Sequence, residues 1–336
     1  MSKFFARSLL LCLIGLYFPA TADRVMPNAL IANPPKRPAG FLPPPLNPRG
    51  ITLERRKLGE GVYALMSNTD FADNSGFVVG DDAVLVIDSH FNGEMAQQII
   101  DIVRDTTALP IKYLVNTNAF GDHTFGNYIF PQETKIVAFS GTIDALKAST
   151  VEGIAKTMAR TVDGDLSVFD GVELRIPDQG FEQSWSVDLG GKIVQVHWLG
   201  TGMSPNDSVV FLPKERIAWT ANLVFGEGSI PWARSGNINQ YKKTITALRN
   251  KLDPVLIVPG HGEITSNERV EVYESYLSDV IELAKQAKAN EVEIISFSDA
   301  AEIDARYKIN PNLMALMTGF HRWNLRVAYS EAVTDR

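Results

Sequence analysis

Cysteine is almost absent from this sequence, and histidine is scarce. Among 336 residues there is one cysteine, Cys12, so no disulfide can form within the chain. Cys12 lies in an apolar N-terminal segment, which leaves the rest of the chain without a thiolate nucleophile or a cysteine metal ligand. Acid–base or metal chemistry must therefore use carboxylates and a few imidazoles. The histidines are His90, His123, His197, His261 and His321.

Positive charge is also in deficit. The sequence has 32 Lys and Arg residues against 39 Asp and Glu residues, a formal net charge of -7. An acidic chain argues against nucleic acids and anionic membranes as partners, so we expect a small-molecule substrate. The sequence leaves the oligomeric state open.

Long apolar runs are missing except at the N-terminus. Lys3 and Arg7 precede the apolar run 8–18, and Ala20-Thr21-Ala22 then offers a cleavage site of small residues. This pattern predicts a signal peptide over residues 1–22 and a periplasmic or secreted protein. An uncleaved anchor is less favoured, because the run is shorter than the roughly 20 residues that a spanning helix needs. Cleavage would remove Cys12 and two positive charges, which changes the formal net charge to -9.

Prolines dominate the next segment. Residues 23–49 include Pro43-Pro44-Pro45, which favours an extended backbone and disfavours helices and central strands. We predict an arm that lies along the surface of one domain, residues 50–336, which ends in helices.

Hydrophobic patterns in this domain predict two halves that each combine strands with a helix. The first half has expected strands at 52–58, 62–66, 76–79, 83–88 and 111–115, and a helix at 94–107. The second half has expected strands at 187–189, 193–196, 209–212, 217–220 and 255–258, and a helix at 240–252. Two such halves predict an α/β fold, an αββα sandwich of two mixed β-sheets with helices outside.

The C-terminal region has helical periodicity. Thr265 with Glu268 forms an expected capping box, Ser298-Asp299 is an expected cap of a second helix, and residues 313–332 form a third apolar stripe. We assign these helices to packing, because apolar stripes at helical spacing usually face a core.

Two histidines lie in loops that follow apolar strands. Asp122 and His123 end the segment Asn116-Thr117-Asn118-Ala119-Phe120-Gly121, and Gly121 permits the turn that would let both side chains face one ion. His261 lies in Pro259-Gly260-His261-Gly262, where the glycines free the backbone at the end of a strand. These two loops are the candidate site.

The order of elements and these loops resemble the metallo-β-lactamase superfamily over roughly residues 50–263. The family motif His-x-His-x-Asp-His falls here on Asn118, Phe120, Asp122 and His123. The later family histidine falls on Met203, and the bridging aspartate falls on Asn222. The resemblance thus implies that the first metal site is lost. Asp122, His123 and His261 match the set that holds the second metal in some lactamases.

Three interpretations of the function follow. The first is an exported hydrolase of a small organic ester, lactone or amide that uses at most one zinc or other divalent ion, held by Asp122, His123 and His261. In it, Asn118 or Asn222 orients water or a carbonyl. The second is a metal-independent lyase or isomerase that uses Asp122, His123 or His261 as acid or base. The third is a binding protein without catalysis.

The expected substrate pocket contains Phe120, Met203 and His90. Phe120, Phe125 and Trp232 near the expected mouth favour a substrate with apolar bulk over a phosphate. His197 and His321 are expected to be structural. The superfamily hosts many hydrolytic reactions, so the fold does not select a substrate.

Overall fold

The computed structural model describes residues 36–234 and 237–332. The predicted signal peptide, 1–22, and the first part of the predicted arm lie outside the described residues. In the described part of the chain, no helix combines the length and apolar character needed to cross a membrane.

The described residues form twelve strands in two mixed sheets, and the two-sheet arrangement confirms the predicted fold class. The seven-stranded sheet has the order β1-β2-β3-β4-β5-β6-β7, with antiparallel pairs up to β4 and parallel pairs beyond it. The five-stranded sheet has the order β12-β11-β10-β9-β8, in which only β11 and β12 pair in parallel. The strands are β1 (Leu53–Gly59), β2 (Val62–Ser67), β3 (Ser75–Val79), β4 (Val84–Ile87), β5 (Ile111–Asn116), β6 (Lys135–Phe139), β7 (Gln179–Phe181), β8 (Ser184–Asp188), β9 (Ile193–Trp198), β10 (Ser208–Leu212), β11 (Ile217–Ala221) and β12 (Leu256–Pro259).

Strand periodicity places alternate side chains in different layers. On β4, Leu85 and Ile87 face the core between the two sheets, whereas Val84 and Val86 pack under α1. On β10, Val210 faces the same inter-sheet core, while its neighbours face the helices on the other side. Because both faces are covered at β4 and β10, these two strands are almost entirely apolar. A fully buried aliphatic side chain of this kind contributes about 1.5–3 kcal/mol.

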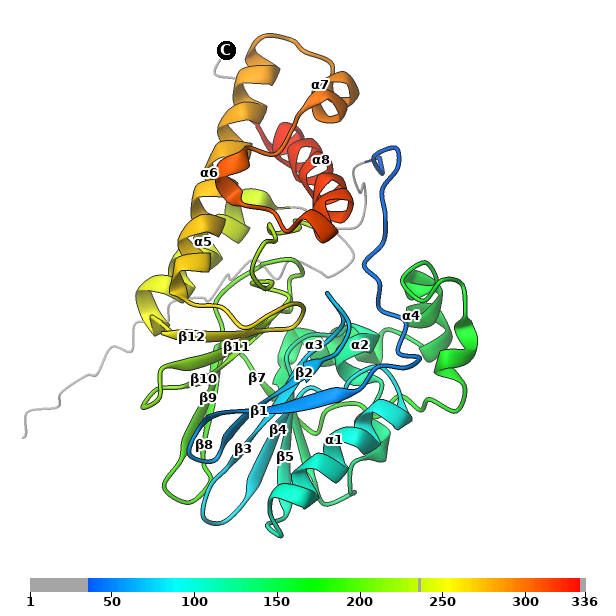
Figure 1. Cartoon of the computed structure of the whole chain (residues 1–336), viewed down its shortest axis with the longest axis vertical. Helices are drawn as coiled ribbons and strands as arrows, with labels where there is room; N and C mark the ends of the chain where they lie inside the picture. Colours follow the sequence, from blue (N-terminus) through cyan, green and yellow to red (C-terminus); the bar gives the residue numbers. More distant parts are fainter. Residues whose placement is uncertain (1–35, 235–236, 333–336) are drawn as a thin grey trace, which may run out of the picture.

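Helices lie outside the two sheets, which completes the predicted αββα order. Helix α1 covers the seven-stranded sheet, and α5, α6 and α8 pack together beyond the five-stranded sheet (Figure 1). The helices are α1 (Gly93–Thr106), α2 (Gly121–Thr124), α3 (Ser140–Lys147), α4 (Val151–Met158), α5 (Ile238–Ala247), α6 (Asn267–Ala289), α7 (Ile294–Ala300) and α8 (Met314–Glu331). A π-helical turn, Leu248–Leu252, extends α5.

Two predicted helix caps are wrong. Helix α6 is capped by Ser266, whose side chain accepts from the Glu268 N–H, because Thr265 instead pairs with Ile257 in a β-bridge. Ser298 and Asp299 lie inside α7, and Glu293 caps that helix by accepting from two backbone N–H groups. The cap of α6 is thus shifted by one residue, whereas α7 begins before the predicted cap.

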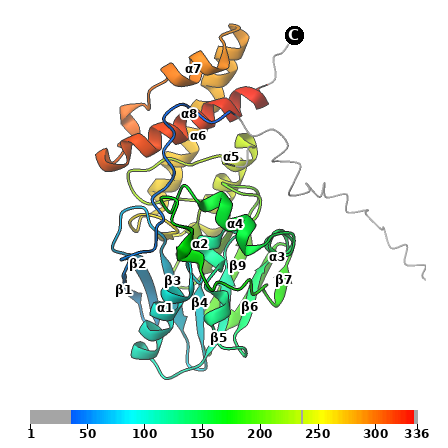
Figure 2. The same ribbon diagram turned by 90° about the vertical axis from the view of Figure 1, so that its right-hand side faces the viewer.

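The N-terminal arm, residues 36–49, crosses from the C-terminal helices to the α4 region (Figures 1 and 2). The Leu46 N–H donates to the Thr161 carbonyl at 2.8 Å, and Arg160 donates to the Phe41 carbonyl at 3.1 Å. The Phe41 ring is 5.9 Å from that of Trp323 on α8. The arm is therefore anchored at both ends, and it passes over the strand ends where the candidate site lies.

Candidate metal centre and cavity

Loops from both sheets meet at one edge of the sandwich. The loop after β5 leads into the short helix α2, which carries Asp122 and His123, and His261 follows β12. Two further loops, between β2 and β3 and after β4, bring Asp73 and Asp88 to the same place. Working residues commonly lie on such loops, which a rigid sheet scaffold positions.

The backbone of these loops is strained. Four non-glycine residues have left-handed backbone angles there: Phe71 (φ 64°), Asp88 (φ 59°), His90 (φ 64°) and Ala221 (φ 46°). Each such residue costs on the order of 1–3 kcal/mol, and such strain clusters at functional sites. The surrounding fold therefore holds these loops in conformations that they would not adopt by themselves.

His123 is held by Asp88. Its Nδ1 donates to Asp88 Oδ2 at 2.8 Å, which turns Nε2 toward Asp122 Oδ2 at 3.6 Å and Asn222 Nδ2 at 3.2 Å. Burial opposes a charge on the imidazole, but the Asp88 and Asp122 carboxylates outweigh it and raise the pKa of His123 to about 9. The Asn222 amide can present either its nitrogen or its oxygen to Nε2, so it matches either protonation state.

His261 has the same orientation relative to Asp122. Its Nδ1 lies 3.2 Å from the Phe71 carbonyl oxygen, and its Nε2 lies 3.7 Å from Asp122 Oδ2. The ring stacks on that of Phe71, with centroids 5.4 Å apart. Burial lowers the pKa of His261 to about 4, so the imidazole is neutral near pH 7 and keeps a free lone pair.

Asp73 is buried and lacks hydrogen-bond partners. Its side chain is 1% exposed, and neither carboxylate oxygen has a hydrogen-bond partner among the described residues. Oδ1 lies 3.3 Å from His261 Nδ1, but that nitrogen has the Phe71 carbonyl as its acceptor. Burial, followed by the adjacent Asp122, raises the pKa of Asp73 well above its usual range. Either a proton or a cation must therefore accompany these two carboxyl groups.

The four side chains form one compact group. One ligand atom each from Asp73, Asp122, His123 and His261 lies within 4.8 Å of the others. The structure thus brings together the three residues that the sequence singled out, and it adds Asp73, which the sequence analysis missed. Asp88, which holds His123, was not predicted from the sequence either. Asp88 directly follows the buried strand β4, which is the one local signal for it, whereas Asp73 lies two residues before β3 and has no such signal.

Apolar side chains occupy two of the three positions where the family motif places the other metal's histidines. Phe120 is partly buried, and its ring lies beneath the Arg234 guanidinium at 4.6 Å. Met203 is buried in the cluster around α5 and α8. Asn118 is fully buried, and its Oδ1 accepts from the Phe120 N–H at 2.9 Å. No second metal site is formed by these three residues.

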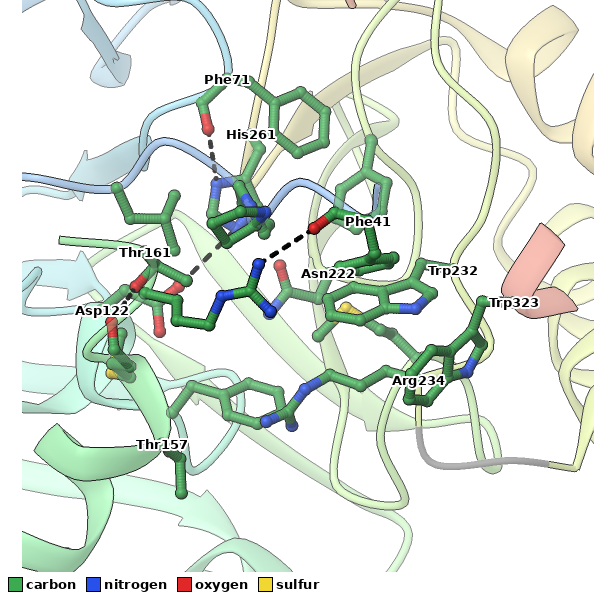
Figure 3. A pocket seen from close by; sticks show the side chains of 18 of the residues that line it. Phe41, Phe71, Asp122, Thr157, Thr161, Asn222, Trp232, Arg234, His261 and Trp323 are labelled. Atoms are coloured by element: carbon green, nitrogen blue, oxygen red, sulfur yellow. Dashed lines mark hydrogen bonds and ion pairs between the residues drawn. The ribbon is translucent and has the colours of Figure 1, made fainter. Parts of the chain in front are cut away.

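A cavity of about 270 Å³ lies beside the four-residue group. Asp122, Asn222 and His261 line its polar side, and Figure 3 shows aromatic rings facing them. Phe41 and Trp232 belong to that aromatic wall, which the N-terminal arm closes. The other lining residues are Arg37, Pro43, Pro44, Leu46, Phe71, Phe120, Thr157, Met158, Arg160, Thr161, Met203, Phe225, Arg234 and Trp323.

Two predicted placements, those of His90 and Phe125, differ from the structure. His90 does not line the described cavity: it is buried, and its Nε2 lies 3.1 Å from the Asp73 carbonyl oxygen. Asn118, which the sequence suggests for orienting water or a carbonyl, is not among the residues that line the cavity; its Oδ1 accepts from the Phe120 N–H, whereas its buried Nδ2 has no hydrogen-bond partner among the described residues. Phe125 does not reach the mouth, because it packs edge-on against Phe169 in a separate core. Phe120, Trp232 and Met203 do line the cavity.

The two remaining histidines lie elsewhere. On β9, Nε2 of His197 lies 3.1 Å from Oε1 of Gln195. On α8, Nδ1 of His321 lies 2.9 Å from the Tyr276 hydroxyl oxygen. Neither residue belongs to the four-residue group or to the cavity lining.

Comparisons with known proteins agree on one family. The sequence profile of the metallo-beta-lactamase superfamily matches residues 68–261, well over half of the chain. A metallo-beta-lactamase type 2 from Bacteroides fragilis is 23% identical over 235 residues, which are 67% of this chain and 86% of the relative.

Solved structures give the same picture for the fold. A metallo-beta-lactamase from Pontibacter korlensis aligns with a TM-score of 0.57 and 17% identity, covering 68% of this chain and 100% of that one. The DIM-1 metallo-beta-lactamase aligns with a TM-score of 0.55 and 16% identity, covering 68% and 99%. At 16–17% sequence identity, these alignments show a shared fold only.

Proposed function

The chain belongs to the metallo-beta-lactamase superfamily, and on that basis we propose that it is a hydrolase of a small organic ester, lactone or amide that uses a single divalent metal ion. Asp122, His123 and His261 would hold the ion, with zinc as the first candidate. The geometry of these three side chains supports this function.

The orientation of the two imidazoles carries the proposal. In both His123 and His261 the Nδ1 atom is occupied by an acceptor, Asp88 or the Phe71 carbonyl, so both Nε2 atoms are turned toward Asp122 Oδ2. Metal-binding histidines are commonly fixed in this way, by a hydrogen bond from the nitrogen that does not bind the metal. The residues present therefore fit a divalent ion.

One carboxylate and two imidazoles leave room for water and substrate at the ion. When bound, such an ion supplies Lewis-acid activation of a carbonyl group and of water. Asn222 lines the cavity, and its Oδ1 has no hydrogen-bond partner among the described residues, so its amide is available to orient a water or a carbonyl. The aromatic wall offers a surface for the apolar part of a substrate.

A second candidate function has its own observation. Asp73 and Asp122 are neighbouring buried carboxyl groups, and such a pair can share a proton when no cation is present. A shared proton would make the pair an acid–base device for a lyase or isomerase step that needs no metal. The same side chains thus support two chemistries, which metal analysis separates.

Metal analysis of protein purified without chelator tests the proposal. We expect about one zinc, iron or manganese ion per chain, and turnover of at least one probe among p-nitrophenyl acetate, γ-butyrolactone and a chromogenic β-lactam. His261→Ala should lose both, whereas His197→Ala on β9 should keep both. If the unsubstituted protein contains no stoichiometric metal, the proposal of a metal-dependent hydrolase is wrong. Turnover that persists in chelator would favour the acid–base alternative, and ligand binding without turnover would favour a binding protein.

Arg234 indicates which substrates the cavity favours. Its guanidinium stacks on Phe120 and lies 5.8 Å from the Trp232 ring, and no described side chain forms a hydrogen bond or ion pair with it. Figure 3 places it along the cavity. A partly buried guanidinium without an anionic partner can bind a carboxylate through two parallel hydrogen bonds. We therefore propose substrates that carry an anionic group beside an apolar body.

Arg234→Met should weaken the binding of anionic substrates selectively. We expect KM for a hemisuccinate aryl ester to rise about tenfold, equivalent to about 1.4 kcal/mol, with kcat nearly unchanged. KM for the corresponding neutral acetate ester should change little. Arg104→Met, on the exposed face of α1, is the control. Equal changes for the charged and neutral esters would contradict anion recognition.

Export and partners also remain proposals. The N-terminal pattern of Lys3, Arg7 and residues 8–18 supports cleavage after Ala22 and a periplasmic or secreted protein. The acidic composition and the cavity support a small-molecule substrate and argue against nucleic acid. N-terminal sequencing of the protein recovered outside the cytoplasm checks the cleavage site.

A further inference from the structure

We propose that Asp73 is a fourth metal ligand, supplied by the loop between β2 and β3, and that it replaces the negative oxygen that the family's bridging aspartate would have provided at Asn222. This inference rests on the proposed metal-dependent function. It concerns a residue that lies outside the family motif and 49 positions before Asp122.

The first argument is the state of the Asp73 side chain. It is fully buried, and both its oxygens lack hydrogen-bond partners among the described residues. A buried carboxylate without hydrogen bonds is unfavourable by several kcal/mol, and proteins accept that cost where a cation or a proton completes the group. One Asp73 oxygen lies within 4.8 Å of a ligand atom of each of Asp122, His123 and His261. The unpaired carboxylate is therefore located where a cation would be held.

The second argument is how the backbone fixes Asp73. Asp73 and His261 form an isolated antiparallel β-bridge, and the Asn74 N–H donates to the Gly260 carbonyl at 2.7 Å. The Asn74 amide also donates to the carbonyls of Pro259 and Gly262, at 3.0 and 2.8 Å. Asp73 is thus attached to the His261 loop by main-chain pairing, which leaves its side chain free to bind an ion in a preorganised position.

The third argument is charge. With Asn222 in place of a bridging aspartate, the motif residues alone offer one negative charge, from Asp122, to a divalent ion. Asp73 adds a second, so two carboxylates and two neutral imidazoles balance the ion within the buried site. Asp88 does not serve this purpose, because its oxygens already accept from Thr117 and His123. With four protein ligands, an ion that accepts five or six ligands, such as ferrous iron or manganese, still keeps positions for water and substrate, and zinc keeps one when it is five-coordinate.

The experiment compares metal binding by the unsubstituted protein and three variants. The metal-free forms of the unsubstituted protein, Asp73→Asn, Asp73→Ser and Asp70→Asn are titrated with zinc against a chromogenic chelator, and with cobalt while the visible absorption is recorded. Asp70 lies exposed in the same loop and is the matched control. We expect Asp73→Asn and Asp73→Ser to bind zinc at least about tenfold more weakly and to change the cobalt spectrum, because a ligand is lost. Asp70→Asn should match the unsubstituted protein in both respects.

Thermal unfolding separates this role from a structural one. Because the Asp73 carboxylate makes no hydrogen bond, metal-free Asp73→Asn should unfold at no lower temperature than the metal-free unsubstituted protein. Unchanged zinc affinity and an unchanged cobalt spectrum in both Asp73 variants would overturn the inference and leave the proposed function standing. If the unsubstituted protein binds neither zinc nor cobalt, the proposed function and this inference fail together.

Discussion

Asp122→Asn is expected to lower kcat/KM for the best ester, lactone or amide probe by at least about a thousandfold. Asp122 Oδ2 is the atom that both free imidazole nitrogens face, at 3.6 and 3.7 Å. An amide has the same shape but carries no charge, so it binds a divalent ion far more weakly than a carboxylate does. Loss of the ion removes several kcal/mol of transition-state stabilisation, and about 1.4 kcal/mol corresponds to each factor of ten.

Metal content must fall together with activity in this variant. Zinc, iron and manganese measured on freshly purified Asp122→Asn should be far below one ion per chain. The matched control is Asp105→Asn, on the exposed face of α1, which should keep metal and turnover. If Asp122→Asn retains a full complement of metal and hydrolyses the probes at the unsubstituted rate, Asp122 is not a ligand.

Much of the fold was predictable, because hydrophobic alternation is a local property. The hairpin of β3 and β4 and the third C-terminal helix, α8, each lie within one or two residues of the predicted limits. Hydrophobic patterns predict no element in the region between β5 and β8. Its strands β6 and β7 are short, and its helices α3 and α4 have eight residues each, too few to produce a clear period.

The site was predictable only where a motif lies in one loop. Asp122, His123 and His261 follow apolar strands in recognisable loops, and the structure places them together. Asp73 reaches the same place through pairing with a loop nearly 190 positions away, for which single-sequence patterns carry no signal. The proline-rich arm was expected to be extended, but its sequence does not reveal that Phe41 packs against Trp232 above the site. The position of Asp73 and the packing of Phe41 both depend on contacts between segments far apart in the sequence.

Asp88→Asn is expected to lower the unfolding free energy of the metal-free protein by about 3 kcal/mol at pH 6. Asp88 is buried and accepts three hydrogen bonds, from the Thr117 N–H and hydroxyl and from His123 Nδ1. An amide nitrogen cannot accept, so one of these donors loses its partner. The imidazolium of His123 also loses the charge that stabilises it inside the protein.

The pH dependence of this effect has a definite sign. His123 has a pKa of about 9 in the folded protein, above its ordinary value of 6.5. A raised pKa of a base contributes stability that is fully present below about pH 6.5 and disappears as the pH rises through 9. The difference in unfolding free energy between the unsubstituted protein and Asp88→Asn should therefore be larger at pH 6 than at pH 9.5. Urea denaturation of both metal-free proteins measures it, with Asp81→Asn, exposed in the β3–β4 turn, as control.

The contact between Asp88 and His123 also determines how many protons are released when a metal ion binds. At pH 7 the His123 imidazole of the metal-free protein is charged, so an ion that takes its Nε2 must displace a proton. The Asp73 and Asp122 pair holds a further proton when no cation is present, so metal binding displaces that proton as well. The apparent zinc affinity should therefore rise about tenfold to a hundredfold per pH unit toward pH 9, a slope that calorimetry in two buffers of different ionisation enthalpy can resolve. In Asp88→Asn the pKa of His123 falls, so this slope should flatten, while the affinity at pH 9 drops about 10–100-fold because the imidazole is no longer held. An unchanged slope would mean that Asp88 does not control the charge of His123, and that the imidazole is oriented by Asp122 and Asn222 alone.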